Sequence, residues 1–231
     1  MSLTLHYHPL ASFCHKVLIA LYEAQTPFTA HVVDLMDGGA KTRFLDLWPV
    51  GKIPVLRDEA RDATVPETTI IVEYLDRHYP GPRPLLPADE DARLETRLWD
   101  RFFDLYVHAP MQAIVGDRLR PEEARDPTGV AAARATLAVA YGMIEKRMAE
   151  RTWAAGEDFS LADCAAAPAL FYAGIVAPFP PGYASLADYF ERLAARPSFA
   201  RVLAEARPYF AMFPFKDDMP ARFLEGGAPG R

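Results

Sequence analysis

The chain has 231 residues, 51% of them hydrophobic and 24% charged, and it carries a formal net charge of -6 at pH 7. This composition indicates a globular protein with room for two domains, and it excludes disordered and collagen-like classes. We expect no nucleic-acid partner, because binding to phosphates needs a basic surface, and no membrane partner, because no apolar run reaches the ~18 residues that a span requires.

The first 80 residues alternate between strand and helix patterns. Residues 3–7 alternate apolar and polar side chains, as a half-buried strand does. Apolar residues at helical spacing follow from Phe13, and Ser12 is a good N-cap for them. The pattern continues with a β-branched run over 29–35, a short helix over 42–47, a strand over 48–56, a charged turn over 57–64 and a helix over 69–79. The order β-α-β-α-β-β-α predicts a small α/β domain.

A proline-rich linker and a helical half follow. Four prolines crowd into residues 80–87, which leaves no room for a helix and predicts a stiff linker over 81–88. Beyond it every apolar pattern has the helical period. Ser160 and Asp163 have the spacing of a capping box at a helix start. We therefore predict an α/β domain over 1–80, an all-α domain over 89–215 and a loose tail over 216–231.

Cysteine usage indicates a reducing compartment. The two cysteines, Cys14 and Cys164, are far apart and form no CxxC pair. Three histidines near the N-terminus, His6, His8 and His15, lack a further ligand at a spacing that would complete a metal site. No signal peptide is evident. We therefore predict a cytoplasmic protein without a bound metal or a disulfide.

Five sequence segments resemble a known family. YHPLASFCHKVLIAL, FLDLWPVGKIPVL and PETTIIVEYLDRHYP resemble, in order and spacing, the thioredoxin-like N-terminal domain of the cytosolic glutathione S-transferases. FSLADCAAAP and YFERLAARPSFARVL resemble parts of that family's helical domain, so the resemblance covers roughly residues 3–210. It implies a thioredoxin-like domain joined to an all-α domain, glutathione as co-substrate, a role in detoxification and a homodimer.

Six residues are implied by this resemblance to hold glutathione. They are Lys41, Lys52, Ile53, Pro54, Glu67 and Thr68. A proline inside a strand pattern already marks Pro54 as a bend or a cis bond at a functional place, and a cis bond would free the Ile53 backbone to pair with the cysteinyl part of the ligand. Thr68 and Glu67, at a helix start, would bind the γ-glutamyl carboxylate and ammonium groups. The two lysines would approach the glycine carboxylate.

Three residues compete for the role of activating the glutathione thiol. Ser12 is our first choice, because a hydroxyl at a helix N-terminus, together with the helix dipole, favours a thiolate. Alternatively, Ser12 only caps the helix and has no role in binding. Cys14 would form a mixed disulfide with glutathione, unless it is a buried small hydrophobe, and Tyr7 lies at the end of the first strand, unless it belongs to the core. In many relatives the active residue falls one position earlier, where this chain has Ala11.

The resemblance leads to one main function and two alternatives. The main function is conjugation of the glutathione thiolate to a hydrophobic electrophile held against the helical domain, in a pocket near Tyr106, Met111 and Phe171 or Tyr172. The first alternative is a thiol–disulfide oxidoreductase that uses Cys14. The second is a non-catalytic binding protein with a transferase-like fold.

Overall fold

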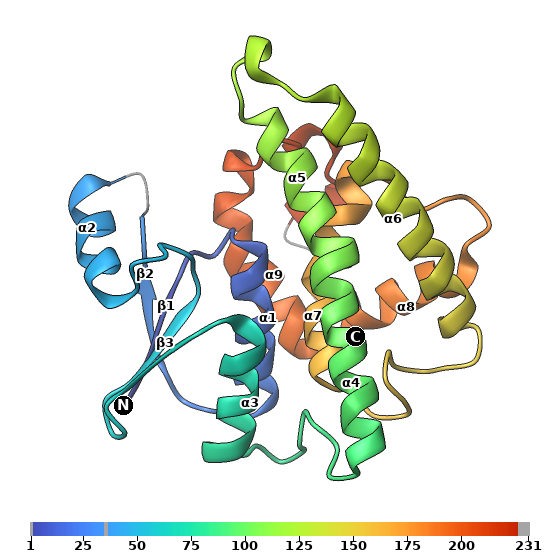
Figure 1. The fold of residues 1–231 in the computed structure, drawn as a ribbon. Coiled ribbons are helices and arrows are strands. Elements are labelled where there is room, and N and C mark those ends of the chain that lie inside the picture. Colours follow the sequence, from blue (N-terminus) through green and yellow to red (C-terminus); the bar gives the residue numbers. More distant parts are fainter. Residues whose placement is uncertain (1, 35–36, 226–231) are drawn as a thin grey trace.

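The structure is a computed structural model that describes residues 2–34 and 37–225 (Figure 1). A four-stranded sheet with its helices forms one side of the molecule, and a bundle of longer helices forms the other. The predicted combination of a thioredoxin-like α/β domain and an all-α domain is confirmed. No helix in the described part of the chain is both long enough and apolar enough to cross a membrane.

The sheet has the strand order β2-β1-β3-β4. Its strands are β1 (Leu3–Tyr7), β2 (Thr29–Val32), β3 (Val55–Asp58) and β4 (Ala63–Pro66). Strand β1 pairs in parallel with β2 and antiparallel with β3, so that Leu5 lies between Ala30 and Leu56. The β-branched run that we predicted over 29–35 contains β2, and residue 35 lies outside the described residues.

Helices cover both faces of the sheet. On one face, α1 (Ser12–Glu23) and α3 (Thr68–His78) pack against each other and against the helical domain. On the other face, α2 (Gly38–Leu47) packs Phe44 against Val55. Because β1 and β4 run in the same direction and each leads into its helix, α1 and α3 both run downward in Figure 1, with their N-terminal ends at the same end of the sheet. The predicted element order is confirmed.

The helical domain consists of long helices around a buried central one. Its elements are α4 (Glu90–Phe102), the π-helical segment η1 (Phe103–His108), α5 (Ala109–Arg118), the 3-10 turn η2 (Glu122–Ala124), α6 (Pro127–Met148), α7 (Leu161–Val176), α8 (Ala184–Ala195) and α9 (Pro197–Ala206). Almost all of α7 is buried, and it begins with the predicted capping box of Ser160 and Asp163. The segments α4, η1 and α5 form one continuous run of helix beside α7 (Figure 1).

The C-terminal segment is ordered as far as the structure describes it, unlike the loose tail that we predicted. It contains η3 (Arg207–Met212), η4 (Lys216–Asp218) and the short helix α10 (Ala221–Leu224). The Phe223 ring packs edge-on against Phe171, and Arg222 forms a two-pronged ion pair with Glu191. These contacts hold 216–225 on the helical domain, whereas 226–231 lie outside the described residues. The prediction missed them because composition alone does not reveal which aromatic side chain a tail buries.

Candidate functional site

The loop between β1 and α1 is fixed from several directions. The Tyr172 hydroxyl, from the core of the helical domain, donates a hydrogen bond of 3.0 Å to the carbonyl oxygen of Leu10. His15 Nε2 lies 2.6 Å from the carbonyl oxygen of Pro9, and the Leu10 N–H donates to His8 Nδ1 at 3.1 Å. The loop that leads into α1 therefore has a set geometry that depends on both domains.

Helix α1 begins one residue earlier than the predicted cap implies. Ala11 is the N-cap and Ser12 is the first helical residue, so the prediction that Ser12 caps the helix is wrong. No side chain caps the helix and no acidic residue lies in its first turn. Because the first N–H groups of a helix lack partners inside the helix and lie at the positive end of its dipole, this end favours an anion.

The structure separates the three candidates for thiol activation. Cys14 is fully buried, and burial raises the pKa of its thiol to about 12, so almost none is thiolate at neutral pH. Burial and the nearby Glu205 carboxylate raise the pKa of Tyr7, which is the wrong direction for a hydroxyl that stabilises a thiolate. Ser12 lies at the domain boundary, where its Oγ is 2.5 Å from Nε2 of His108 in the helical domain. Ser12 is therefore the candidate that the geometry favours.

The start of α3 has the features expected of a binding site for a charged group. Glu67 is the N-cap, and its φ of 69° is unusual for a residue with a side chain. Its own side chain makes no capping bond and is exposed, so the carboxylate is free to meet a ligand. Thr68 follows as the first helical residue, where its N–H lacks a partner within the helix. Strained backbone of this kind is found preferentially at binding sites.

The turn before β3 supplies free backbone groups. The predicted cis bond is present between Ile53 and Pro54. Among the described residues, neither polar backbone group of Ile53 pairs with another backbone group. Gly51 has a φ of 71°, which a glycine adopts without penalty, and it turns the chain into this segment. Ile53 is thus placed like an edge-strand residue with its hydrogen-bonding groups available.

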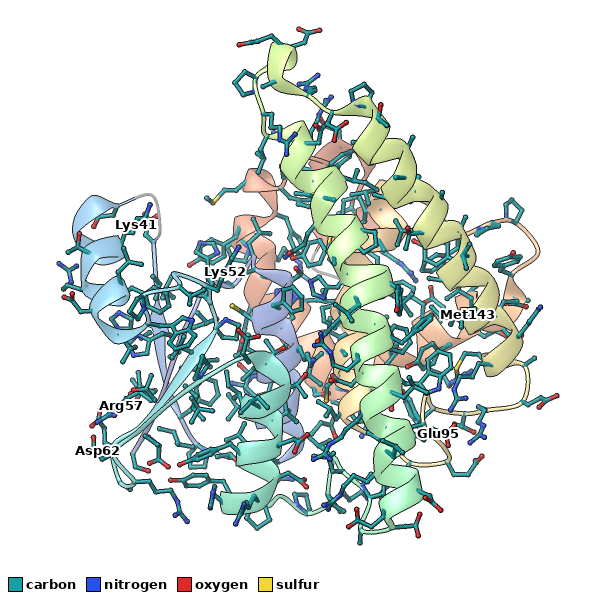
Figure 2. All side chains as sticks on the ribbon, viewed as in Figure 1. Lys41, Lys52, Arg57, Asp62, Glu95 and Met143 are labelled. Atoms are coloured by element: carbon teal, nitrogen blue, oxygen red, sulfur yellow. The ribbon has the colours of Figure 1, made fainter. Side chains whose placement is uncertain are left out.

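Two lysines lie at the same end of the domain as the start of α1. Lys41 is on α2 and Lys52 is next to the cis bond, and both side chains are exposed (Figure 2). Neither lysine forms an ion pair with a described residue. Both are free to meet a carboxylate, although the structure does not bring their side chains together.

The side chains predicted for the electrophile pocket lie at different depths in the helical domain. Met111 and Tyr172 are each only 2% exposed, and Phe171 is also in the core of the helical domain. Tyr106 is 51% exposed and packs against the Phe102 ring on the outer side of η1. Tyr106 is therefore exposed, whereas Met111 and Tyr172 are buried. The helical pattern identified all three as apolar, but it did not tell inward from outward positions.

Comparisons with known proteins find one family that matches both parts of the chain. The family model for the glutathione S-transferase N-terminal domain matches residues 11–78, and the model for its C-terminal domain matches residues 102–197. "FtsZ-localized protein A" of Caulobacter vibrioides is 31% identical over 228 residues, which cover 94% of this chain and 97% of the relative. A "Stringent starvation protein A homolog" of Coxiella burnetii is 30% identical, with 88% of this chain and 92% of the relative covered.

This chain belongs to the glutathione S-transferase family. Among solved structures, a glutathione S-transferase from Methylobacillus flagellatus with glutathione bound has a TM-score of 0.79 and 27% identity, over 87% of this chain and 98% of that one.

An ionic cluster near this site was not predicted from the sequence. Lys16 of α1 is completely buried, and its Nζ lies 2.6 Å from Asp100 Oδ1 and 2.8 Å from Asp104 Oδ2. It also donates to the Thr69 hydroxyl at 3.0 Å, which in turn donates to Asp100 at 2.7 Å. The cluster ties the start of α3 to the helical domain. Two acids four residues apart in an apolar stretch, LWDRFFDLY, were the available signal.

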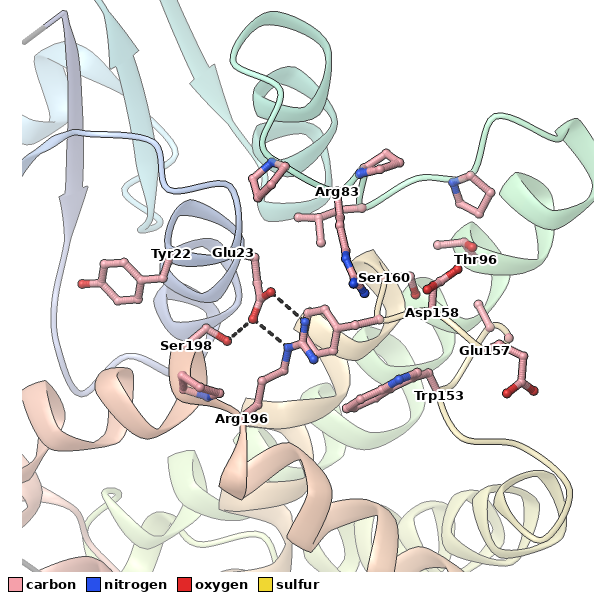
Figure 3. A pocket seen from close by; sticks show the side chains of 18 of the residues that line it. Tyr22, Glu23, Arg83, Thr96, Trp153, Glu157, Asp158, Ser160, Arg196 and Ser198 are labelled. Carbon is pink, nitrogen blue, oxygen red and sulfur yellow. Dashed lines mark hydrogen bonds and ion pairs between the residues drawn. The ribbon is translucent and has the colours of Figure 1, made fainter. Parts of the chain in front are cut away.

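A cavity of about 1060 Å³ lies at the other end of α1 (Figure 3). Its walls come from the proline-rich linker, the loop over 153–160 and the start of α9. Arg196 forms a two-pronged ion pair with Glu23 at 2.7 Å and lies over the Phe159 ring, and Ser198 also donates to Glu23. Glu23, Arg196 and Ser198 therefore satisfy one another within the cavity wall.

The described residues contain no group of three or more His, Cys, Asp or Glu side chains placed to hold a metal ion.

Proposed function

We propose that this chain is a glutathione-dependent transferase that joins the glutathione sulfur to a hydrophobic electrophile. The observation that carries the proposal is the convergence of three segments at one end of the sheet: the uncapped start of α1, the start of α3, and the unpaired backbone of Ile53. Each offers free N–H groups or a carboxylate to a different part of a peptide-like anion. Solved structures of two glutathione S-transferases, one with glutathione and one with glutathione sulfonate bound, support this choice of ligand.

The proposed chemistry follows from the helix end. The free N–H groups of α1 and the Ser12 hydroxyl stabilise the glutathione thiolate. The thiolate sulfur attacks an electrophilic carbon, a carbon–sulfur bond forms, and the leaving group departs with the bonding electrons. Cys14 and Cys164 are both buried, which counts against a mixed disulfide between either cysteine and glutathione. Free cysteines are also consistent with a protein of the reducing cytoplasm. The electrophile stays unassigned.

Glutathione binding and conjugation test this function. We expect calorimetry to detect glutathione binding, and we expect conjugation to 1-chloro-2,4-dinitrobenzene to fall strongly in Ser12→Ala but to persist in Cys14→Ala. Glu67→Gly should weaken glutathione binding about tenfold, the value of one charge-assisted hydrogen bond, while protein stability stays the same or rises by up to ~1 kcal/mol because the positive φ is relieved.

The matched control is Gln25→Gly, at another position with positive φ that lies away from the site. It should leave glutathione binding unchanged. If wild-type protein binds no glutathione, or if Gln25→Gly weakens binding as much as Glu67→Gly does, the proposed site is wrong.

A second candidate is a docking protein that binds a partner instead of an electrophile. It is favoured by Ala11, which has no hydroxyl at a position where many relatives have one, and by relatives whose names refer to FtsZ and to starvation. If wild type and Ser12→Ala both bind glutathione but neither conjugates it to the aryl halide, the docking protein is favoured over the transferase.

We also propose that two copies of the chain associate through α3 and α4. Leu94 and Leu98 lie four residues apart on α4 and are 67% and 63% exposed, and Ile70 of α3 and Leu105 of η1 are also exposed apolar residues. Helices α3 and α4 lie next to each other in Figure 1. Apolar side chains gathered on one face of a soluble protein mark an interface, and family resemblance indicates a second copy as the partner.

Leu98→Glu should convert the dimer into a monomer in sedimentation, because a buried unpaired charge would face its own copy across the interface. Val139→Glu, which changes an equally exposed residue on α6, is the control and should leave the dimer intact. A wild-type monomer at micromolar concentration would contradict the proposal.

A further inference from the structure

Two side chains of the helical domain converge on the Ser12 hydroxyl. His108 Nε2, at the end of η1, lies 2.5 Å from Ser12 Oγ, and Gln112 Nε2, one turn later on α5, lies 3.4 Å from the same oxygen. Ser12 and His108 are 96 residues apart in sequence, so this contact exists only when the two domains are docked.

The imidazole of His108 is held in one orientation. The residue is fully buried, and its ring stacks in parallel on Phe13, with 3.7 Å between centroids and 3° between planes. Its other nitrogen, Nδ1, is buried without a hydrogen-bond partner among the described residues. Within residues 2–34 and 37–225, the ring therefore has a single polar contact, the one with Ser12.

The unpartnered Nδ1 indicates which nitrogen carries the proton. A buried N–H without an acceptor is rare and costly, whereas an acceptor without a donor is tolerated more often. The proton therefore belongs on Nε2, and His108 donates to Ser12 Oγ. Burial lowers the pKa of His108 well below its usual value, and the positive Lys16 and nearby His15 act in the same direction. The ring is neutral.

Both lone pairs of the Ser12 oxygen are then filled. A hydroxyl has two acceptor sites and one donor hydrogen, and His108 and Gln112 occupy the acceptor sites. Among the described residues no acceptor remains for the Ser12 hydrogen. A hydroxyl that accepts two hydrogen bonds is also polarised into a stronger donor.

We propose that His108 and Gln112 are positioning residues that leave the Ser12 hydroxyl free to donate only to the sulfur of glutathione. This inference rests on the proposed function, in which Ser12 contacts that sulfur. It goes further by making thiol activation depend on the helical domain, so that glutathione bound to the first domain is activated only across the domain boundary. Neither positioning residue needs to touch glutathione itself.

The proposal is tested by the pKa of the thiol of bound glutathione. This pKa is measured from the ultraviolet absorbance of the thiolate across a pH series, at saturating glutathione. His108→Phe keeps an aromatic ring against Phe13 but removes the donor. We expect it to raise the bound thiol pKa by about one unit, which is a tenfold loss of thiolate at neutral pH, while the Kd for glutathione changes less than the thiolate population does. His108→Gln, which restores a side-chain N–H donor, should recover part of the effect.

A double variant separates this route from a general structural effect. In a Ser12→Ala background, His108→Phe should change the thiol pKa no further, because its effect passes through the missing hydroxyl. If wild-type protein binds no glutathione, the proposed function and this inference both fall. If glutathione binds but the thiol pKa is the same in wild type and His108→Phe, or shifts equally with and without Ser12, the inference alone is overturned. Urea unfolding of each variant identifies any that fail to fold, and His108→Gln then supplies the comparison.

Discussion

Lys16→Met is expected to lower the free energy of unfolding by about 3–5 kcal/mol. The Lys16 ammonium lies between the carboxylates of Asp100 and Asp104, and all three side chains are 5% exposed or less. Without the lysine, Asp100 would keep only the Thr69 hydroxyl and Asp104 only the half-exposed Arg101, so two buried carboxylates would face each other without a buried cation. Burial already raises the pKa of Asp104 against the opposing effect of Lys16, so removing Lys16 would push it further in the same direction. Urea unfolding followed by circular dichroism measures the change.

Two comparisons make this result specific to the buried cluster. Lys41→Met removes an exposed lysine from α2 and should change stability by less than ~0.5 kcal/mol. Replacing Lys16, Asp100 and Asp104 together by Met, Leu and Leu should recover most of the loss, because an apolar set of similar volume needs no charge compensation. If Lys16→Met is as stable as wild type, water or another group compensates the charges of Asp100 and Asp104.

This cluster shows where prediction from the sequence stopped. The strand and helix order followed from periodicity, because a strand alternates every second residue and an amphipathic helix every third or fourth. The cis bond at Pro54 and the capping box of Ser160 and Asp163 followed from local chemistry that involves neighbours in sequence. Lys16 and Asp104 are 88 residues apart, and no local rule pairs them. The sequence shows Lys16 within an apolar helix pattern, but it does not indicate which acidic residue pairs with it.

The candidate site divides in the same way. Glu67 and Thr68 were placed correctly at a helix start and Ile53 beside a cis bond, because these positions depend on the local backbone. The Ser12 side chain was assigned to the wrong helix position, and its contact with His108 was not foreseen. Asp104 and His108, four residues apart, are buried on one side of η1, and Tyr106 between them is exposed on the other. Local spacing can place residues on one face, but it does not reveal that His108 meets Ser12 of the other domain.

The stability of the wild-type protein should fall relative to that of His15→Gln as the pH drops from 6.5 to 4. His15 is fully buried, and burial lowers its pKa to about 4, although the hydrogen bond to the Pro9 carbonyl acts in the opposite direction. Within this window the histidine of the unfolded chain is protonated and that of the native protein is not. The stabilisation is therefore present above pH 6.5 and is lost on the way down to pH 4, by on the order of 3 kcal/mol.

Other groups titrate in the same window, so the comparison with a variant is essential. The lowered pKa of His108 adds to the loss, whereas the raised pKa values of Asp104 and Asp163 oppose it, and all three are common to both proteins. His15→Gln keeps a side-chain N–H donor for the loop but does not titrate. His31→Gln, on the exposed strand β2, is the control for loss of a surface histidine. If the stability difference between wild type and His15→Gln is the same at pH 7 and pH 4, His15 accepts its proton without leaving the core. The loop that leads into α1 would then keep its structure whether the His15 ring is neutral or protonated.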